Sequence, residues 1–64
     1  MKIEDIKQIA KLIPFTIFTT DSHPVTVPHE DYIYFVPNRD LFIVVSLENR
    51  IQIIDSNHVT KIEQ

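Results

Sequence analysis

The chain has 64 residues, with six lysines and arginines against nine aspartates and glutamates, and therefore a net charge of −3. This length predicts a single domain, 1–64, with one core, and the acidic balance argues against the broad phosphate-neutralising surface of a general DNA-binding protein. Cysteine and glycine are both absent, which excludes cysteine-based zinc sites, thiol nucleophiles and the glycine-rich loops that hold phosphates.

The N-terminal segment predicts a short helix over about residues 3–12. Apolar residues recur there at spacings of three and four, which places one apolar stripe along the helix. The stripe consists of Ile3, Ile6, Ile9, Ala10 and Ile13. Pro14 ends the helix. Because so short a helix is marginal alone, we expect it to pack on a sheet through Ile6, Ile9 and Ile13.

From Phe15 the composition changes to aromatic and β-branched residues, which predicts short strands from about residue 15 to 62. The stretches concerned are 15–20, 25–27, 32–36, 41–45, 51–54 and 59–62. Residues 41–45 are apolar on both faces, as in a central strand, and Pro28 predicts a kink or a sheet edge because proline lacks a ladder donor. Without glycine, the turns must use asparagine, aspartate, serine and proline.

A single capped helical turn is predicted at Asp55, Ser56 and Asn57, whose side-chain oxygens can accept backbone hydrogen bonds. The expected fold class is mostly β, with an N-terminal α-helix followed by a strongly bent antiparallel sheet of about five strands. Short strands with tight connections favour a small barrel, since closing the sheet removes its edges.

No residue pattern indicates catalysis or a metal site, so we expect no enzyme activity and no cofactor. The three histidines, His23, His29 and His58, lie at no recognised metal-ligand spacing. Asp21, Ser22 and His23 have the residue types of a hydrolase triad, but adjacent residues in a turn cannot form its hydrogen-bond relay.

Two tyrosines, Tyr32 and Tyr34, alternate along one predicted strand and therefore share a face. Exposed aromatic pairs of this kind can stack bases. They are also typical of structural or subunit-interface residues, and in a chain this small we favour that interpretation.

Two segments carry a resemblance to a known family. His29 to Asn38 (HEDYIYFVPN) and Asn57 to Ile62 (NHVTKI) resemble the Sm-like, or SH3-like, small barrel of the bacterial RNA chaperone Hfq. The resemblance implies an RNA-binding pocket formed by Tyr32 as the stacking ring, His58, and the neighbouring Asp31 and Asn57. Asp31 stands where the family has glutamine, and Asn57 where it has lysine. The chain also resembles a group of short uncharacterised bacterial proteins, which implies no activity.

The expected function is a non-catalytic, homo-oligomeric Sm-like module that binds single-stranded RNA and has a regulatory role. The alternative is a module or scaffold that binds another protein. No apolar run approaches the roughly 20 residues that cross a bilayer, and residues 1–5 lack the features of a signal peptide, so we expect a cytoplasmic protein without a membrane partner. The ligand, ring size and pathway stay open.

Overall fold

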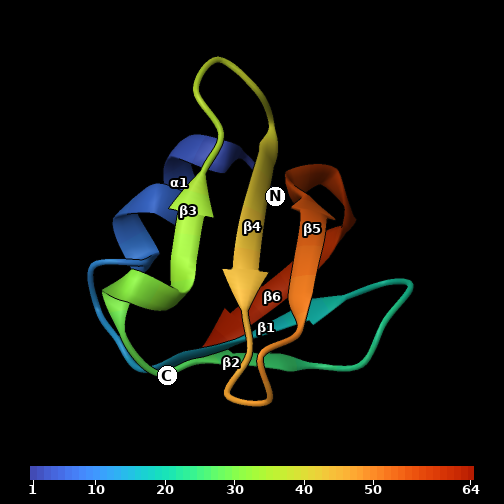
Figure 1. The fold of residues 1–64 in the computed structure, drawn as a ribbon. Helices are drawn as coiled ribbons and strands as arrows, with labels where there is room; N and C mark the ends of the chain where they lie inside the picture. The colour runs from blue at the N-terminus through green and yellow to red at the C-terminus, as the bar shows by residue number, and fades with distance from the viewer.

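A computed structural model describes residues 1–64 as one α-helix, six β-strands and two 3₁₀ helices (Figure 1). In chain order the elements are α1 (Ile3–Ile9), β1 (Phe15–Thr19), β2 (Val25–Val27), η1 (Glu30–Tyr32), β3 (Ile33–Phe35), β4 (Leu41–Val45), β5 (Ile51–Asp55), η2 (Ser56–His58) and β6 (Val59–Glu63). The mostly β fold with an N-terminal helix is therefore confirmed. No helix has the length and apolar character needed to cross a membrane.

The strands form two antiparallel sheets of three strands each, in the orders β2–β1–β6 and β3–β4–β5. The prediction of five strands in one closed, bent sheet is therefore wrong. The chain leaves β2 at Pro28, which cannot donate to a ladder, and makes the 3₁₀ turn of η1 before β3 begins. No ladder joins β5 to the other sheet, so the barrel stays open.

One core lies between the helix and the two sheets. Figure 1 shows α1 beside β3 and the β2–β1–β6 sheet crossing behind the lower part of the β3–β4–β5 sheet. The buried apolar side chains are Ile3, Ile6, Ala10, Phe15, Ile17, Val25, Val27, Phe42, Val44, Ile54 and Val59. The core thus draws on α1 and on both sheets, as a single small domain requires.

The helix is shorter than predicted and turns a slightly different face to the core. It ends at Ile9, and the Lys11 and Leu12 N–H groups then donate to carbonyls three residues back, which tightens the last turn. Ile3 and Ile6 are buried, whereas Ile9 and Ile13 are half-buried. The predicted packing through Ile6 is confirmed, and Ile3 and Ala10 complete the buried stripe in place of Ile9 and Ile13.

The turns use the residues expected of a chain without glycine. Asn38 and Asn49 adopt positive φ angles of 60° and 63°, which asparagine tolerates better than most residues. Asp55 caps η2, since its Oδ1 accepts the Asn57 N–H at 2.9 Å. The predicted capped turn before the last strand is therefore confirmed.

Candidate functional site

The four residues predicted to form an RNA pocket lie in two separate turns. Asp31 and Tyr32 belong to η1, which precedes β3, whereas Asn57 and His58 belong to η2, which follows β5. Because β3, β4 and β5 alternate in direction, the start of β3 and the end of β5 are at opposite ends of the sheet as well as at opposite edges (Figure 1). A single copy of the chain does not bring the four side chains together.

The η1 turn is held mainly by local contacts. His29 caps it, because its Nδ1 accepts the Asp31 N–H at 3.3 Å, and the Asp31 carboxylate lies 3.5 Å from the same nitrogen. Tyr32 is half-buried and packs against the core. Tyr34 is 58% exposed on β3. The two tyrosines therefore differ in environment, and only Tyr34 offers an exposed ring on the sheet.

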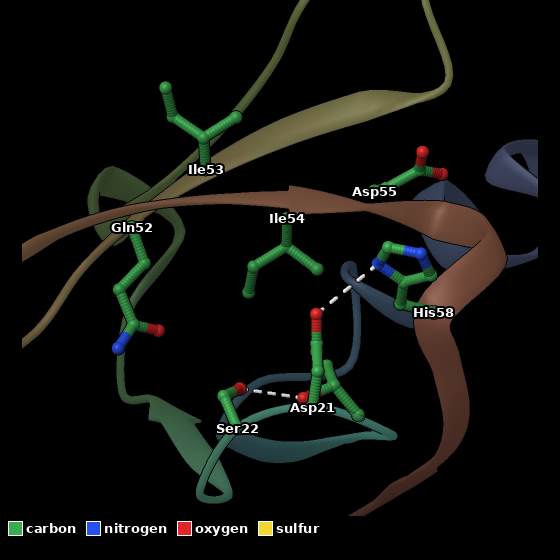
Figure 2. A pocket seen from close by; sticks show the side chains of 8 residues that line it. Asp21, Ser22, Gln52, Ile53, Ile54, Asp55 and His58 are labelled. Atoms are coloured by element: carbon green, nitrogen blue, oxygen red, sulfur yellow. Dashed lines mark hydrogen bonds and ion pairs between the residues drawn. The ribbon is translucent and has the colours of Figure 1, made fainter.

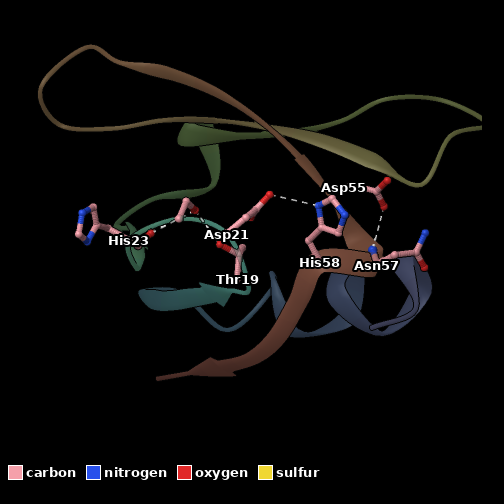
Figure 3. Close-up of polar contacts among 7 residues, drawn as sticks. Thr19, Asp21, His23, Asp55, Asn57 and His58 are labelled. Carbon is pink, nitrogen blue, oxygen red and sulfur yellow. Dashed lines mark hydrogen bonds and ion pairs between the residues drawn. The ribbon is translucent and has the colours of Figure 1, made fainter.

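The η2 turn borders a cavity beside β5. His58 Nδ1 lies 3.5 Å from Oδ2 of Asp21, in the loop after β1 (Figure 3). The Thr20 N–H donates to the His58 carbonyl at 3.0 Å. These contacts hold the loop against η2. The β5 cavity has a volume of about 290 Å³ and is lined by Thr19, Asp21, Ser22, Gln52, Ile53, Ile54, Asp55 and His58.

Figure 2 shows how side chains of β5 lie around this cavity. Gln52 and Ile54 point toward Asp21 and Ser22, while Ile53 points the other way. The cavity is open to solvent, since the Asp21 and His58 side chains are 65% and 52% exposed. It is therefore a polar, solvent-exposed hollow at the edge of a sheet.

The contacts around Ser22 do not form a nucleophilic triad. Ser22 Oγ lies 2.6 Å from Thr19 Oγ1, and the side chain facing Asp21 is His58, not the adjacent His23. No group of three or more histidine, aspartate and glutamate side chains is placed to hold a metal ion. What the hollow offers is hydrogen-bonding groups and carboxylates.

A second surface, which the sequence reasoning did not identify, is the outer face of the β3–β4–β5 sheet. The register pairs Tyr34 with Ile43 and Ile43 with Ile53, so these side chains form one row on the side away from the core. The outer face comprises Tyr34, Leu41, Ile43, Val45, Ile51, Ile53 and Asp55. Ile51 and Ile53 are 72% and 70% exposed. The apolar character of 41–45 on both faces was the sequence signal for it.

No protein-family model, curated protein or solved structure matches this chain.

Proposed function

We propose that the chain is a non-catalytic protein-interaction module that self-associates through the outer face. The observation that supports this most directly is the composition of that face, where six of the seven side chains are apolar and the seventh is Asp55. Contiguous exposed apolar surface in a small chain is typical of an interaction site.

A second copy is the partner that suits this face best. The face carries no lysine or arginine, and its one carboxylate lies at the end of β5, so two copies related by a two-fold axis bring no like charges together at the centre. One side of a body measuring 26 × 24 × 21 Å has roughly one sixth of its 4528 Å² surface, so a dimer through this side buries at most about 750 Å² per copy, slightly less than the roughly 800 Å² of a standard interface.

The test is the molar mass in solution, measured by light scattering after size exclusion from 10 µM to 1 mM. We expect the mass to rise from the 7.5 kDa monomer toward the dimer with increasing concentration. Replacing Ile53 by Thr keeps a β-branched residue but removes apolar area from both copies. We therefore expect the dissociation constant of the dimer to rise at least about tenfold.

Leu12 provides the matched control, because it is 58% exposed and lies outside the sheet. Leu12→Ser should leave the association unchanged. A wild-type protein that stays at the monomer mass over the whole range, or an Ile53→Thr variant that associates as well as the wild type, would refute the proposal.

RNA binding is the second candidate function. It is supported by the exposed ring of Tyr34 and the half-exposed imidazole of His58, both of which a nucleotide can reach. It ranks second because Asp21 and Asp55 border the same cavity as His58, and Asp31 is exposed in η1, the turn before the strand of Tyr34, so these carboxylates repel a phosphate backbone.

A further inference from the structure

The four edge strands of the two sheets differ in how they are protected against pairing with another chain. β2 has only three residues and lies between Pro24 and Pro28, and β3 also has three residues. β6 carries Lys61 at its centre, and its ladder with β1 is interrupted by a register shift. Short length, proline, lysine and irregular register are the features that keep natural edges unpaired.

β5 has none of these features. It is five residues long, Ile51–Asp55, without proline, lysine or a shift in register. Its sequence of apolar and neutral residues before Asp55 is typical of a strand that is paired on both sides. One side of β5 pairs with β4, and the other, which we call the open edge, has no strand beside it.

The hydrogen-bond register shows which backbone groups the open edge presents. At one end of the ladder the Ser46 N–H donates to the Arg50 carbonyl, and at the other the Ser56 N–H donates to the Asp40 carbonyl, each at 2.8 Å. In an antiparallel ladder, bonded pairs alternate, so Gln52 and Ile54 bond to β4. The N–H and C=O groups of Ile51, Ile53 and Asp55 therefore point away from the sheet.

The surroundings of the open edge specify the side chains that an added strand should have. Residues opposite Ile51 and Ile53 would extend the apolar outer face, while those opposite Gln52 and Ile54 would face the β5 cavity. That cavity holds the carboxylate of Asp21 and is bordered by Asp55.

The charge beside the open edge is negative over a longer stretch than the β5 cavity. A neighbouring hollow of about 620 Å³ shares Asp21 with that cavity and adds Glu48 and Arg50. Two carboxylates, one guanidinium and the His23 imidazole border this hollow, and Asp55, whose side chain lies on the outer face, adds a third carboxylate at the other end of the edge. The cavity side of an added strand should thus carry positive charge.

We propose that the open edge of β5 binds an extended segment of another protein as an additional antiparallel strand, with basic residues opposite Gln52 and Ile54 and apolar residues opposite Ile51 and Ile53. Backbone hydrogen bonds would provide affinity, and the alternating side chains would provide specificity. The proposal concerns the backbone groups at the edge of β5, whereas the self-association described above uses side chains of the outer face, and it does not depend on that self-association.

A second copy fits the open edge less well than a basic segment does. Self-pairing of β5 would place the neutral Gln52 and Ile54 side chains over the carboxylates, and it would bring Asp21 and Asp55 of both copies to the same edge. Since each copy has a net charge of −3, such a pairing adds repulsion at the point where a basic segment gains attraction.

The test uses a synthetic peptide of eight alternating valine and lysine residues with blocked ends, titrated into the full chain and followed by ¹⁵N NMR at 20 mM and 300 mM NaCl. We expect amide shifts concentrated at Ile51, Ile53 and Asp55. The same peptide with glutamate in place of lysine should bind at least about tenfold more weakly at low salt, because its charges are reversed. A valine–lysine peptide with a central proline should also bind weakly, since it lacks a ladder donor.

Two charge-neutralising variants locate the contact. Asp21→Asn should weaken binding of the lysine peptide about three- to fivefold at 20 mM NaCl, as expected for an exposed ion pair. Asp55→Asn should weaken binding less, because the Asp55 side chain lies on the outer face, and asparagine preserves the cap of η2. Asp31→Asn is the matched control, because it changes the net charge equally from the other end of the sheet, and it should have no effect.

Three results would overturn the proposal. Equal binding of the lysine and glutamate peptides, or equal weakening by Asp31→Asn, would show that only net charge matters. Peptide-induced shifts confined to other strands, or no binding at 20 mM NaCl, would show that the open edge does not accept this segment. Protection of the Ile51, Ile53 and Asp55 amides from hydrogen exchange that rises with protein concentration without peptide would assign the edge to a second copy, since packing on the outer face leaves these N–H groups unpaired.

Discussion

Asp31 and Asp55 both lie at 3₁₀ helices, but their carboxylates make different contacts. Asp55 Oδ1 accepts the Asn57 N–H, so this side chain stabilises η2 directly. The η1 turn is capped instead by the His29 ring, and the Asp31 carboxylate is exposed beside it. Removing the charge of Asp31 should therefore leave the fold intact and report only on what binds nearby.

This difference makes Asp31 a suitable test of the RNA candidate. If RNA passes η1, Asp31→Asn removes a repulsive charge, so binding should tighten about two- to threefold at 20 mM NaCl and by less at 300 mM, where the charge is screened. The measurement is fluorescence anisotropy of a labelled single-stranded RNA. Asp5→Asn, in the first turn of α1, carries the same charge change elsewhere.

Asp21 provides a second test of RNA binding, because its carboxylate lies 3.5 Å from the His58 ring and repels a phosphate that approaches the ring. Asp21→Asn should therefore tighten RNA binding at 20 mM NaCl and do less at 300 mM, where the charge is screened. Absence of binding at 20 mM NaCl, in the wild type and in both variants, would rule out the RNA candidate. Tyr32→Ala is less informative, because Tyr32 also packs against the core.

For single residues, the sequence predicted contacts between neighbours in the chain better than it predicted which distant residues form a site. The cap at Asp55 could be predicted, because capping depends on residues adjacent in the chain. The grouping of Tyr32 with His58 could not be derived from the residues, since it depends on how strands far apart in sequence are arranged. Asp21 facing His58 was missed for the same reason.

Among the elements, α1 is the clearest case of a segment whose stability comes from packing. It has seven residues and no side-chain cap at its N-terminus, so its own hydrogen bonds hold it weakly. Ile6, with no exposed surface, and Ile3 anchor it on the core. The apolar spacing was sufficient to predict the helix, but not its final turn, which depends on how the chain approaches β1.

We predict that Ile6→Ala lowers the free energy of unfolding by about 2–5 kcal/mol, the range for a large-to-small change in a core. Ile6→Val leaves a smaller cavity and should lower the free energy of unfolding by about 0.5–1.5 kcal/mol. This variant still gives a value if the alanine variant does not fold. Leu12→Ala, at an exposed position, should change the stability by less than about 0.5 kcal/mol. Urea unfolding gives all three values. A similar effect of Ile6→Val and Leu12→Ala would show that α1 does not share the core.

For the strands, alternation and turn residues predicted the positions well, and β2 and β4 have the predicted bounds. The division into two sheets was not predicted, because it depends on whether β5 meets β6 or β1, and no local pattern encodes that contact. Pro28 signalled a kink or edge, but the barrel hypothesis required continuity through it.

On the scale of the whole molecule, the two sheets are separate ladders that share one core. Phe15, Ile17 and Val27 come from the first sheet, and Phe42 and Val44 from the second, and all of them are nearly or completely buried. Within the chain, neither sheet has a core of its own apart from the one that they share. Both sheets should therefore lose their structure together.

This arrangement predicts a single unfolding transition. Tyr32 lies in η1, Tyr34 lies in β3, and there is no tryptophan, so intrinsic fluorescence reports on the β3–β4–β5 sheet alone. Far-ultraviolet circular dichroism reports on both sheets. The two thermal curves should coincide at any given concentration, and the midpoint should rise with concentration if the chain self-associates. A tyrosine transition displaced by several degrees from the dichroism curve would show that the sheets unfold separately.

The uneven protection of the edges has a consequence for how assemblies of this chain can grow. In the language of polymer chemistry, a molecule with one reactive end is monofunctional, and it terminates a chain instead of propagating it. β5 is the one unprotected edge strand. A strand that pairs with it does not change the features that protect β2, β3 and β6 against pairing with another chain. Strand addition should therefore stop after one step, which allows a chain rich in isoleucine and valine to expose a pairing edge without forming fibres.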